Sequence, residues 1–131
     1  MDTSVLTAAR AALAAERRPW LVTVAASTGS TPQRPGAWMA ADETGLLAGT
    51  IGGGKLEFVC TGLVQRGEAR PGLRHFSLNN REAGAVGMIC GGNTDLLFTP
   101  LTDDAPLDDA LALLDTRQQA VFCLPADGGL P

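Results

Sequence analysis

With 131 residues, the chain can form one domain with a real core but not two. Its net charge of −4 gives nucleic-acid binding no electrostatic support, and no apolar run approaches the roughly 20 residues that a membrane span needs. The single histidine excludes a multi-histidine metal site, and three widely spaced cysteines favour reduced thiols over a zinc site or a disulfide framework. Because the N-terminus also lacks the basic stretch of a signal peptide, we expect a cytoplasmic protein.

Helical and extended patterns alternate along the chain. An alanine-rich stretch closed by Arg17-Arg18-Pro19 predicts the first helix, and the apolar run after it predicts a buried strand. Asp42-Glu43-Thr44-Gly45 predicts a hairpin-like turn with glycine where positive φ is needed. The order favours an α/β (or α+β) single domain, with a mixed β-sheet, packed helices and Gly-rich connecting loops. The predicted helices are 3–18, 55–65 and 103–117, and the predicted strands are 20–25, 37–41, 46–50, 73–78, 94–99 and 120–124.

Three consecutive glycines, Gly52 to Gly54, stand between a predicted strand and a predicted helix. Such a run indicates positive φ, or a backbone too close to a neighbour to permit a Cβ, and at a helix N-terminus that neighbour is often an anion. Gly49, four residues, Gly54 and Lys55 match the first part of a phosphate-loop pattern. Leu56 stands in place of the Ser/Thr that holds Mg²⁺, which argues against an ATPase or GTPase. The alternative is a Gly-rich turn with no ligand.

Cys90 is followed by Gly91 and Gly92, which leave the thiol an uncrowded flank and nearby N–H donors that can lower its pKa. Inert packing is the alternative for any thiol, and Cys60 and Cys123 fit it well.

A third candidate loop, residues 27–36, offers the hydroxyls of Ser30 and Thr31 and the guanidinium of Arg34 to a phosphate or carboxylate. Its alternative is a surface loop with a solvated arginine. His75 shares the strand phase of Ser77 and is predicted to be structural or solvent-facing rather than a base. Because no base with an orienting partner emerges from the sequence, we do not expect turnover.

These three loops resemble the XdhC/CoxI proteins, accessory factors for xanthine and carbon monoxide dehydrogenases. The resemblance covers roughly residues 5–101, with its motifs in the family's order. It is carried by residues 22–24, 29–37, 49–57 and 88–92.

The resemblance implies a maturation role: binding the molybdenum cofactor (molybdopterin) transiently, assisting its sulfuration and handing it to an apo molybdenum hydroxylase. A cysteine desulfurase and a second copy of the chain are further partners that it suggests. Family members typically add a C-terminal Rossmann domain, but no Gly-x-Gly-x-x-Gly follows a late strand, so we expect 1–131 to be the N-terminal domain alone, either whole or truncated at its C-terminal end. Two alternatives stay open: a nucleotide- or phosphate-binding protein that uses the Gly49–Lys55 loop, and a cofactor-free assembly adaptor.

The expected ligand contacts combine the resemblance with the chemistry of the loops. The Gly52–Lys55 segment suits the phosphate of the cofactor, and the thiolate of Cys90 suits its soft metal. Many relatives carry a small residue or cysteine where this chain has Lys55, so no cysteine role transfers to that position. The predicted cofactor-binding residues are Ser30, Thr31, Arg34, Gly52, Gly53, Gly54, Lys55, Glu57, Cys90, Gly91 and Gly92, with Cys90 as the candidate neighbour of molybdenum.

Overall fold

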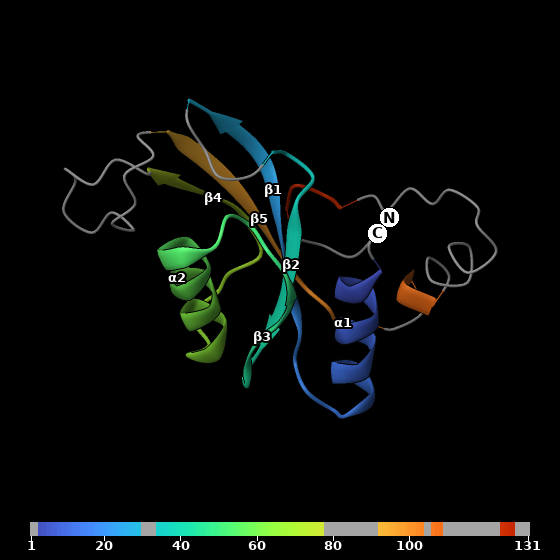
Figure 1. The fold of residues 1–131 in the computed structure, drawn as a ribbon. Coiled ribbons are helices and arrows are strands. Elements are labelled where there is room, and N and C mark those ends of the chain that lie inside the picture. The colour runs from blue at the N-terminus through green and yellow to red at the C-terminus, as the bar shows by residue number, and fades with distance from the viewer. Residues whose placement is uncertain (1–2, 30–33, 78–91, 104–105, 109–123, 128–131) are drawn as a thin grey trace.

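A computed structural model describes residues 3–29, 34–77, 92–103, 106–108 and 124–127 of the chain. A five-stranded sheet stands between two helices, α1 on one face and α2 on the other (Figure 1). The single α/β domain predicted from the sequence is confirmed. The elements are α1 (Ser4–Ala14), β1 (Trp20–Thr28), β2 (Trp38–Asp42), β3 (Gly45–Gly49), α2 (Gly54–Gln65), β4 (Gly72–Ser77) and β5 (Asn93–Pro100).

The strands lie in the order β3-β2-β1-β5-β4, and each of the four described pairings is antiparallel. The mixed sheet predicted from the sequence is therefore wrong for the described strands. The helical connection through α2 is of the kind that joins parallel neighbours, but here it links β3 to β4, which are the two edge strands and do not touch. The crossover therefore creates no parallel pair.

Within residues 3–29, two element boundaries depart from the sequence prediction by more than two residues. Helix α1 ends at Ala14 rather than Arg18 because Glu16 takes a φ of 60° and the Arg17 amide donates back to the Ala12 carbonyl, a left-handed helix end. Strand β1 continues past Ala25 to Thr28. Most of the predicted last helix and last strand lies outside the described residues. Residues 106–108, which are described, are helical as predicted.

Two apolar layers hold the helices to the sheet. Leu56 and Cys60 of α2 pack with Val22 and Phe98 on one face. On the other face, Leu6 of α1 packs in a second cluster of buried residues. Within the described residues, no helix is long and apolar enough to cross a bilayer.

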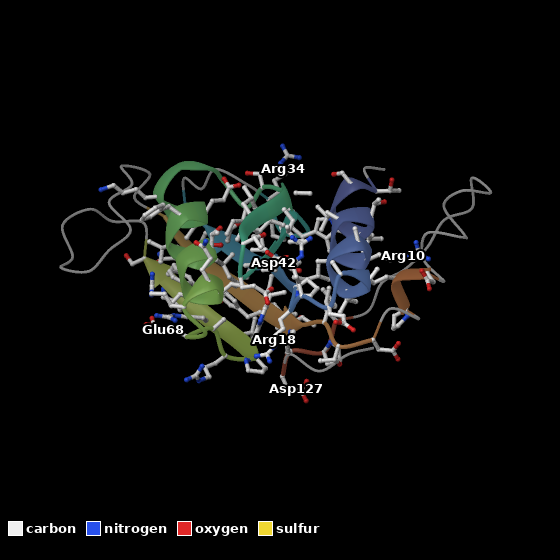
Figure 2. The ribbon with its side chains drawn as sticks, turned by 90° about the horizontal axis from the view of Figure 1, so that it is seen from below. Arg10, Arg18, Arg34, Asp42, Glu68 and Asp127 are labelled. Carbon is white, nitrogen blue, oxygen red and sulfur yellow. The ribbon has the colours of Figure 1, made fainter. Side chains whose placement is uncertain are left out.

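The β2–β3 turn is fixed by a buried carboxylate. The side chain of Asp42 is fully buried, its Oδ1 accepts a 2.7 Å hydrogen bond from the Thr44 amide, and its Oδ2 lies 3.2 Å from Nε of Arg17. Gly45 has a φ of 123°, as the sequence predicted for this turn. Figure 2 shows Asp42 in the middle of the molecule, between the helices. The turn therefore anchors the end of α1 to the sheet.

Candidate functional site

The strand registers bring distant parts of the sequence to one end of the sheet. Thr28 and Ser77, the last residues of β1 and β4, both pair with Asn93, the first residue of β5. Trp38, where β2 begins, and Gly49, where β3 ends, lie at the same end of their strands (Figure 1). We call the end marked by these five residues the motif end.

Three chain connections meet the sheet at the motif end, because β1, β3 and β4 finish there and β2, α2 and β5 start there. They are residues 29–37, 50–53 and 78–92, and each contains at least part of one of the three motifs that the sequence singled out. The fold thus gathers motifs that are up to about 60 residues apart. Four predicted site residues, Ser30, Thr31, Cys90 and Gly91, lie outside the described residues.

The glycine run at the start of α2 has the backbone that the sequence predicted. Gly52, Gly53 and Gly54 have φ values of 138°, 73° and 57°, all in the region that favours glycine. Gly53 is the N-cap of α2 and no side chain caps the helix. A Cβ at Gly54 would meet nothing within 4 Å, so the outer side of the loop is open.

A short chain of hydrogen bonds holds this loop. The Gly52 amide donates to Oγ1 of Thr50 over 3.2 Å, and that hydroxyl donates to Oε2 of Glu57 over 3.1 Å. A Cβ on Gly53 would lie 3.3 Å from the same Glu57 oxygen. The carboxylate of Glu57 therefore lies against the loop, where the positive end of the helix dipole favours it. Glu57 acts as a positioning residue for the loop.

Gly49, the first glycine of the phosphate-loop pattern, is required for a different reason. A Cβ there would lie 2.4 Å from the Trp38 carbonyl oxygen and 2.6 Å from Cγ2 of Val5, and the φ is 85°. This glycine lets β3 end tightly against β2 and α1. Its match to a phosphate loop is therefore explained by packing.

Arg34 and Gly92 also lie at the motif end. The side chain of Arg34 is exposed and points away from the body of the molecule (Figure 2). The Arg34 carbonyl accepts a 3.2 Å hydrogen bond from the Ala37 amide, which shapes the entry to β2. Gly92 is buried directly before β5.

A polar cluster on β4 and β5 was not predicted from the sequence. His75 pairs directly with Asp95 across these strands, and its Nδ1 lies 2.7 Å from Oδ1 of Asp95. Its Nε2 lies 3.2 Å from Oδ1 of Asn93. Because an ionised carboxylate only accepts hydrogen bonds, the Nδ1 of His75 carries a proton. A histidine oriented by a carboxylate is the pairing that the sequence did not reveal, since the register of β4 on β5 cannot be derived from local pattern.

The side chain of Cys60 is fully buried in the layer under α2. Burial disfavours the thiolate and raises the pKa of this thiol to about 12. The predicted inert packing of Cys60 is confirmed.

Comparisons with known proteins give the family. A crystal structure described as a xanthine dehydrogenase from Bacillus halodurans is similar to this chain, with a TM-score of 0.68 and 23% sequence identity. The similarity covers 86% of this chain and 35% of that one, so this chain spans about a third of that structure, and at this identity the likeness concerns the fold. No curated protein matches the sequence. The sequence profile of the XdhC and CoxI family matches residues 12–77, just over half of the chain, from α1 through the glycine loop to the end of β4, and the chain belongs to this family.

Proposed function

We propose that this chain works within an accessory factor for a molybdenum hydroxylase, in the cytoplasm. In this role it holds the molybdenum cofactor at the motif end while the cofactor is sulfurated and passed to the apoenzyme. One observation carries the proposal: three loops of the kind that contact anions and soft metals are attached to the same end of one sheet. Membership of the XdhC and CoxI family, and the likeness to a protein described as a xanthine dehydrogenase, support the class of client enzyme.

The described residues fit the phosphate of the cofactor on one side of the glycine loop. Lys55 is exposed on the first turn of α2, and the space beside Gly54 is open. On the other side, the carboxylate of Glu57 lies against Gly53. Two like charges 4 Å apart repel by about 4 kcal/mol at an effective dielectric constant of 20. The proposed phosphate position is therefore beside Lys55 and Gly54, with Glu57 and Thr50 holding the loop in shape.

Cys90 stays the proposed neighbour of molybdenum, and Ser30, Thr31 and Gly91 stay proposed cofactor contacts. A soft thiolate suits this metal. Cys60 is not a candidate for this thiolate, because its side chain is buried among residues of α2 and the sheet and its pKa is raised to about 12. The bound cofactor would supply the metal centre, and the residues named here would hold and orient it.

Two structural observations count against an ordinary nucleotide as the ligand. The strand before the glycine loop, β3, is an edge strand of an antiparallel sheet, whereas phosphate loops follow strands of parallel sheets. Leu56, which stands where a Mg²⁺-binding hydroxyl is needed, is 1% exposed and packs in the core. A nucleotide-binding protein and a cofactor-free adaptor are therefore the two alternatives that the titration below distinguishes from the proposal.

Equilibrium titration of the purified chain with isolated cofactor, and separately with ATP and GTP, tests this function. We expect cofactor to bind, and Lys55→Ala to weaken binding about tenfold to a hundredfold by removing a charge-assisted phosphate contact. Arg66→Ala, which removes an exposed positive charge just beyond the opposite end of α2, is the matched control and should leave affinity unchanged. Tight nucleotide binding with hydrolysis would replace the proposal with a nucleotide enzyme. Failure of all three ligands would leave the adaptor.

A further inference from the structure

A cavity of about 240 Å³ lies where the connection from α2 to β4 meets the sheet. Leu63 of α2, Phe98 of β5, Arg74 of β4 and the connecting residues Arg70 and Pro71 contribute to its lining. This connection lies at the end of the sheet opposite the motif end, so the cavity is separate from the proposed cofactor site. Its volume is below the roughly 300–1,000 Å³ of pockets for drug-sized ligands, so it suits a ligand with one small ring.

Two arginines of this cavity, Arg70 and Arg74, have no ion-pair partner among the described residues. In contrast, Arg10, Arg17 and Arg66 each pair with a carboxylate. In the whole chain Asp and Glu outnumber Lys and Arg by 14 to 10, but neither Asp nor Glu lines the cavity. The described residues therefore leave an excess of positive charge in the cavity, which a ligand can balance.

The guanidinium of Arg70 is held in place by the backbone around it. Its Nη1 donates to the carbonyl oxygens of Gly67 and Ala69 over 3.1 and 3.0 Å. Because an arginine has five N–H groups, Nε and Nη2 keep their donors for a ligand. Pro71 follows directly and restricts the backbone of Arg70 to extended conformations. A side chain that is already ordered in this way loses little further entropy on binding.

Arg74 is held by an aromatic ring. Its guanidinium carbon lies 5.3 Å from the centroid of the Phe76 ring, two residues along β4. A guanidinium above a ring is attracted to it through its face, and the N–H groups at its rim stay available to an anion. Two guanidinium groups held in this way favour a carboxylate or a phosphate, with which they form charge-assisted hydrogen bonds.

The rest of the lining is apolar. Leu63 and Phe98 belong to the buried cluster under α2, so they form the inner wall of the cavity. Leu73, which is 55% exposed, and Pro71 lie at its rim. An inorganic anion would leave this apolar surface in water, whereas a ligand with an apolar ring would cover it. The lining therefore favours an anion that carries an apolar ring.

We propose that this cavity binds a small amphipathic anion, in which a carboxylate or a phosphate is attached to a single apolar ring. The anionic group lies between Arg70 and Arg74, and the ring lies against Leu63 and Leu73. This proposal goes beyond the proposed function and does not rest on it, because it involves neither Lys55 nor the motif end.

Amide NMR titration of the isotope-labelled chain tests the proposal with four ligands. Benzoate and phenyl phosphate carry both required parts, benzamide is the uncharged counterpart of benzoate, and acetate lacks the ring. We expect benzoate to bind at least tenfold more tightly than benzamide and than acetate, and to shift amide signals among residues 69–74. The comparison of benzoate with phenyl phosphate decides whether the natural anionic group is a carboxylate or a phosphate.

Substitution of the arginines tests the two proposed contacts. Arg70→Gln and Arg74→Gln should each lower benzoate affinity about tenfold to a hundredfold, and lower its preference over benzamide by the same factor, because each removes charge-assisted hydrogen bonds. Arg66→Gln is the matched control, since it makes the same change at an exposed arginine that pairs with Glu68 and does not line the cavity. It should leave benzoate affinity unchanged.

Each outcome of these titrations has a defined meaning. Absence of benzoate binding, equal affinity for benzoate and benzamide or for benzoate and acetate, or unchanged benzoate affinity in both arginine variants would overturn the proposal. Lys55→Ala should bind benzoate as the unaltered chain does, although it is expected to lose affinity for the cofactor. A chain that binds benzoate but not the cofactor would therefore contradict the proposed function while supporting the cavity. Circular dichroism melting checks the fold of each variant, and the comparison of ligands on the unaltered chain does not depend on the variants.

Discussion

The close approach at Gly49 predicts a large and specific loss of stability in Gly49→Ala. The new Cβ would lie 2.4 Å from a backbone oxygen of β2 and 2.6 Å from a side chain of α1, at a φ of 85°. The left-handed backbone costs an alanine about 1–2 kcal/mol, and overpacking against atoms that cannot move away adds about 1–3 kcal/mol. The free energy of unfolding should therefore fall by about 2–5 kcal/mol, a large part of the total for a small domain.

Gly54→Ala is the matched control, because Gly54 also has positive φ, 57°, but a Cβ there meets nothing within 4 Å. Only the backbone cost of about 1–2 kcal/mol applies, partly offset by the about 0.4–1 kcal/mol that a less flexible unfolded chain contributes. Urea unfolding followed by circular dichroism measures both variants under the same conditions. If Gly49→Ala unfolds at the same urea concentration as Gly54→Ala, the packing explanation of Gly49 is wrong.

Three further predictions concern a buried carboxylate and two thiols. Asp42→Asn should lower the free energy of unfolding by about 1–3 kcal/mol in urea unfolding, because it weakens the acceptor that faces Thr44 and Arg17. An equal loss in Glu68→Gln, the same change in an exposed surface ion pair, would contradict this. Cys60 should resist alkylation until the protein unfolds. The pKa of the Cys60 thiol is raised from 9.0 to about 12 in the folded protein, so its contribution to the free energy of unfolding is fully present below pH 9. As the pH rises to 12, this contribution should decline by up to about 4 kcal/mol. The Cys60→Ala variant should not show this decline. Mass spectrometry after brief alkylation should find Cys90 labelled first and protected by bound cofactor; equal labelling of Cys60 would refute the contrast.

The parts of the fold that depend on local chemistry could be predicted from the sequence. The run Gly52 to Gly54 predicts positive φ, because residues other than glycine rarely adopt it in succession, and all three glycines have it. The turn after Asp42 is also local: the Asp42 carboxylate accepts a hydrogen bond from the Thr44 amide, and Gly45 supplies the positive φ with which β3 begins. Such features are visible within four or five residues of sequence.

The parts that depend on register could not be predicted. The bulge after Val24 shows only in the pairing of β1 with β5, and Ser27 and Thr28 beyond it have the composition of a turn. The contact between His75 and Asp95 requires that β5 lie between β1 and β4, which no local pattern specifies. Because the strand order was not predictable either, the sequence did not show that β3 and β4 lie at opposite edges, and a mixed sheet was the prediction.

Amide hydrogen exchange with and without bound cofactor tests most directly whether the motif end is the ligand-binding end. Bound cofactor should slow exchange in peptides that cover Thr50–Gly53 and Gly92–Asn93, which lie at that end. Exchange should stay unchanged at Glu43–Thr44 and at residues 66–71, which connect elements at the opposite end of the sheet. Protection confined to that opposite end, or no protection under conditions in which cofactor is bound, would contradict the account.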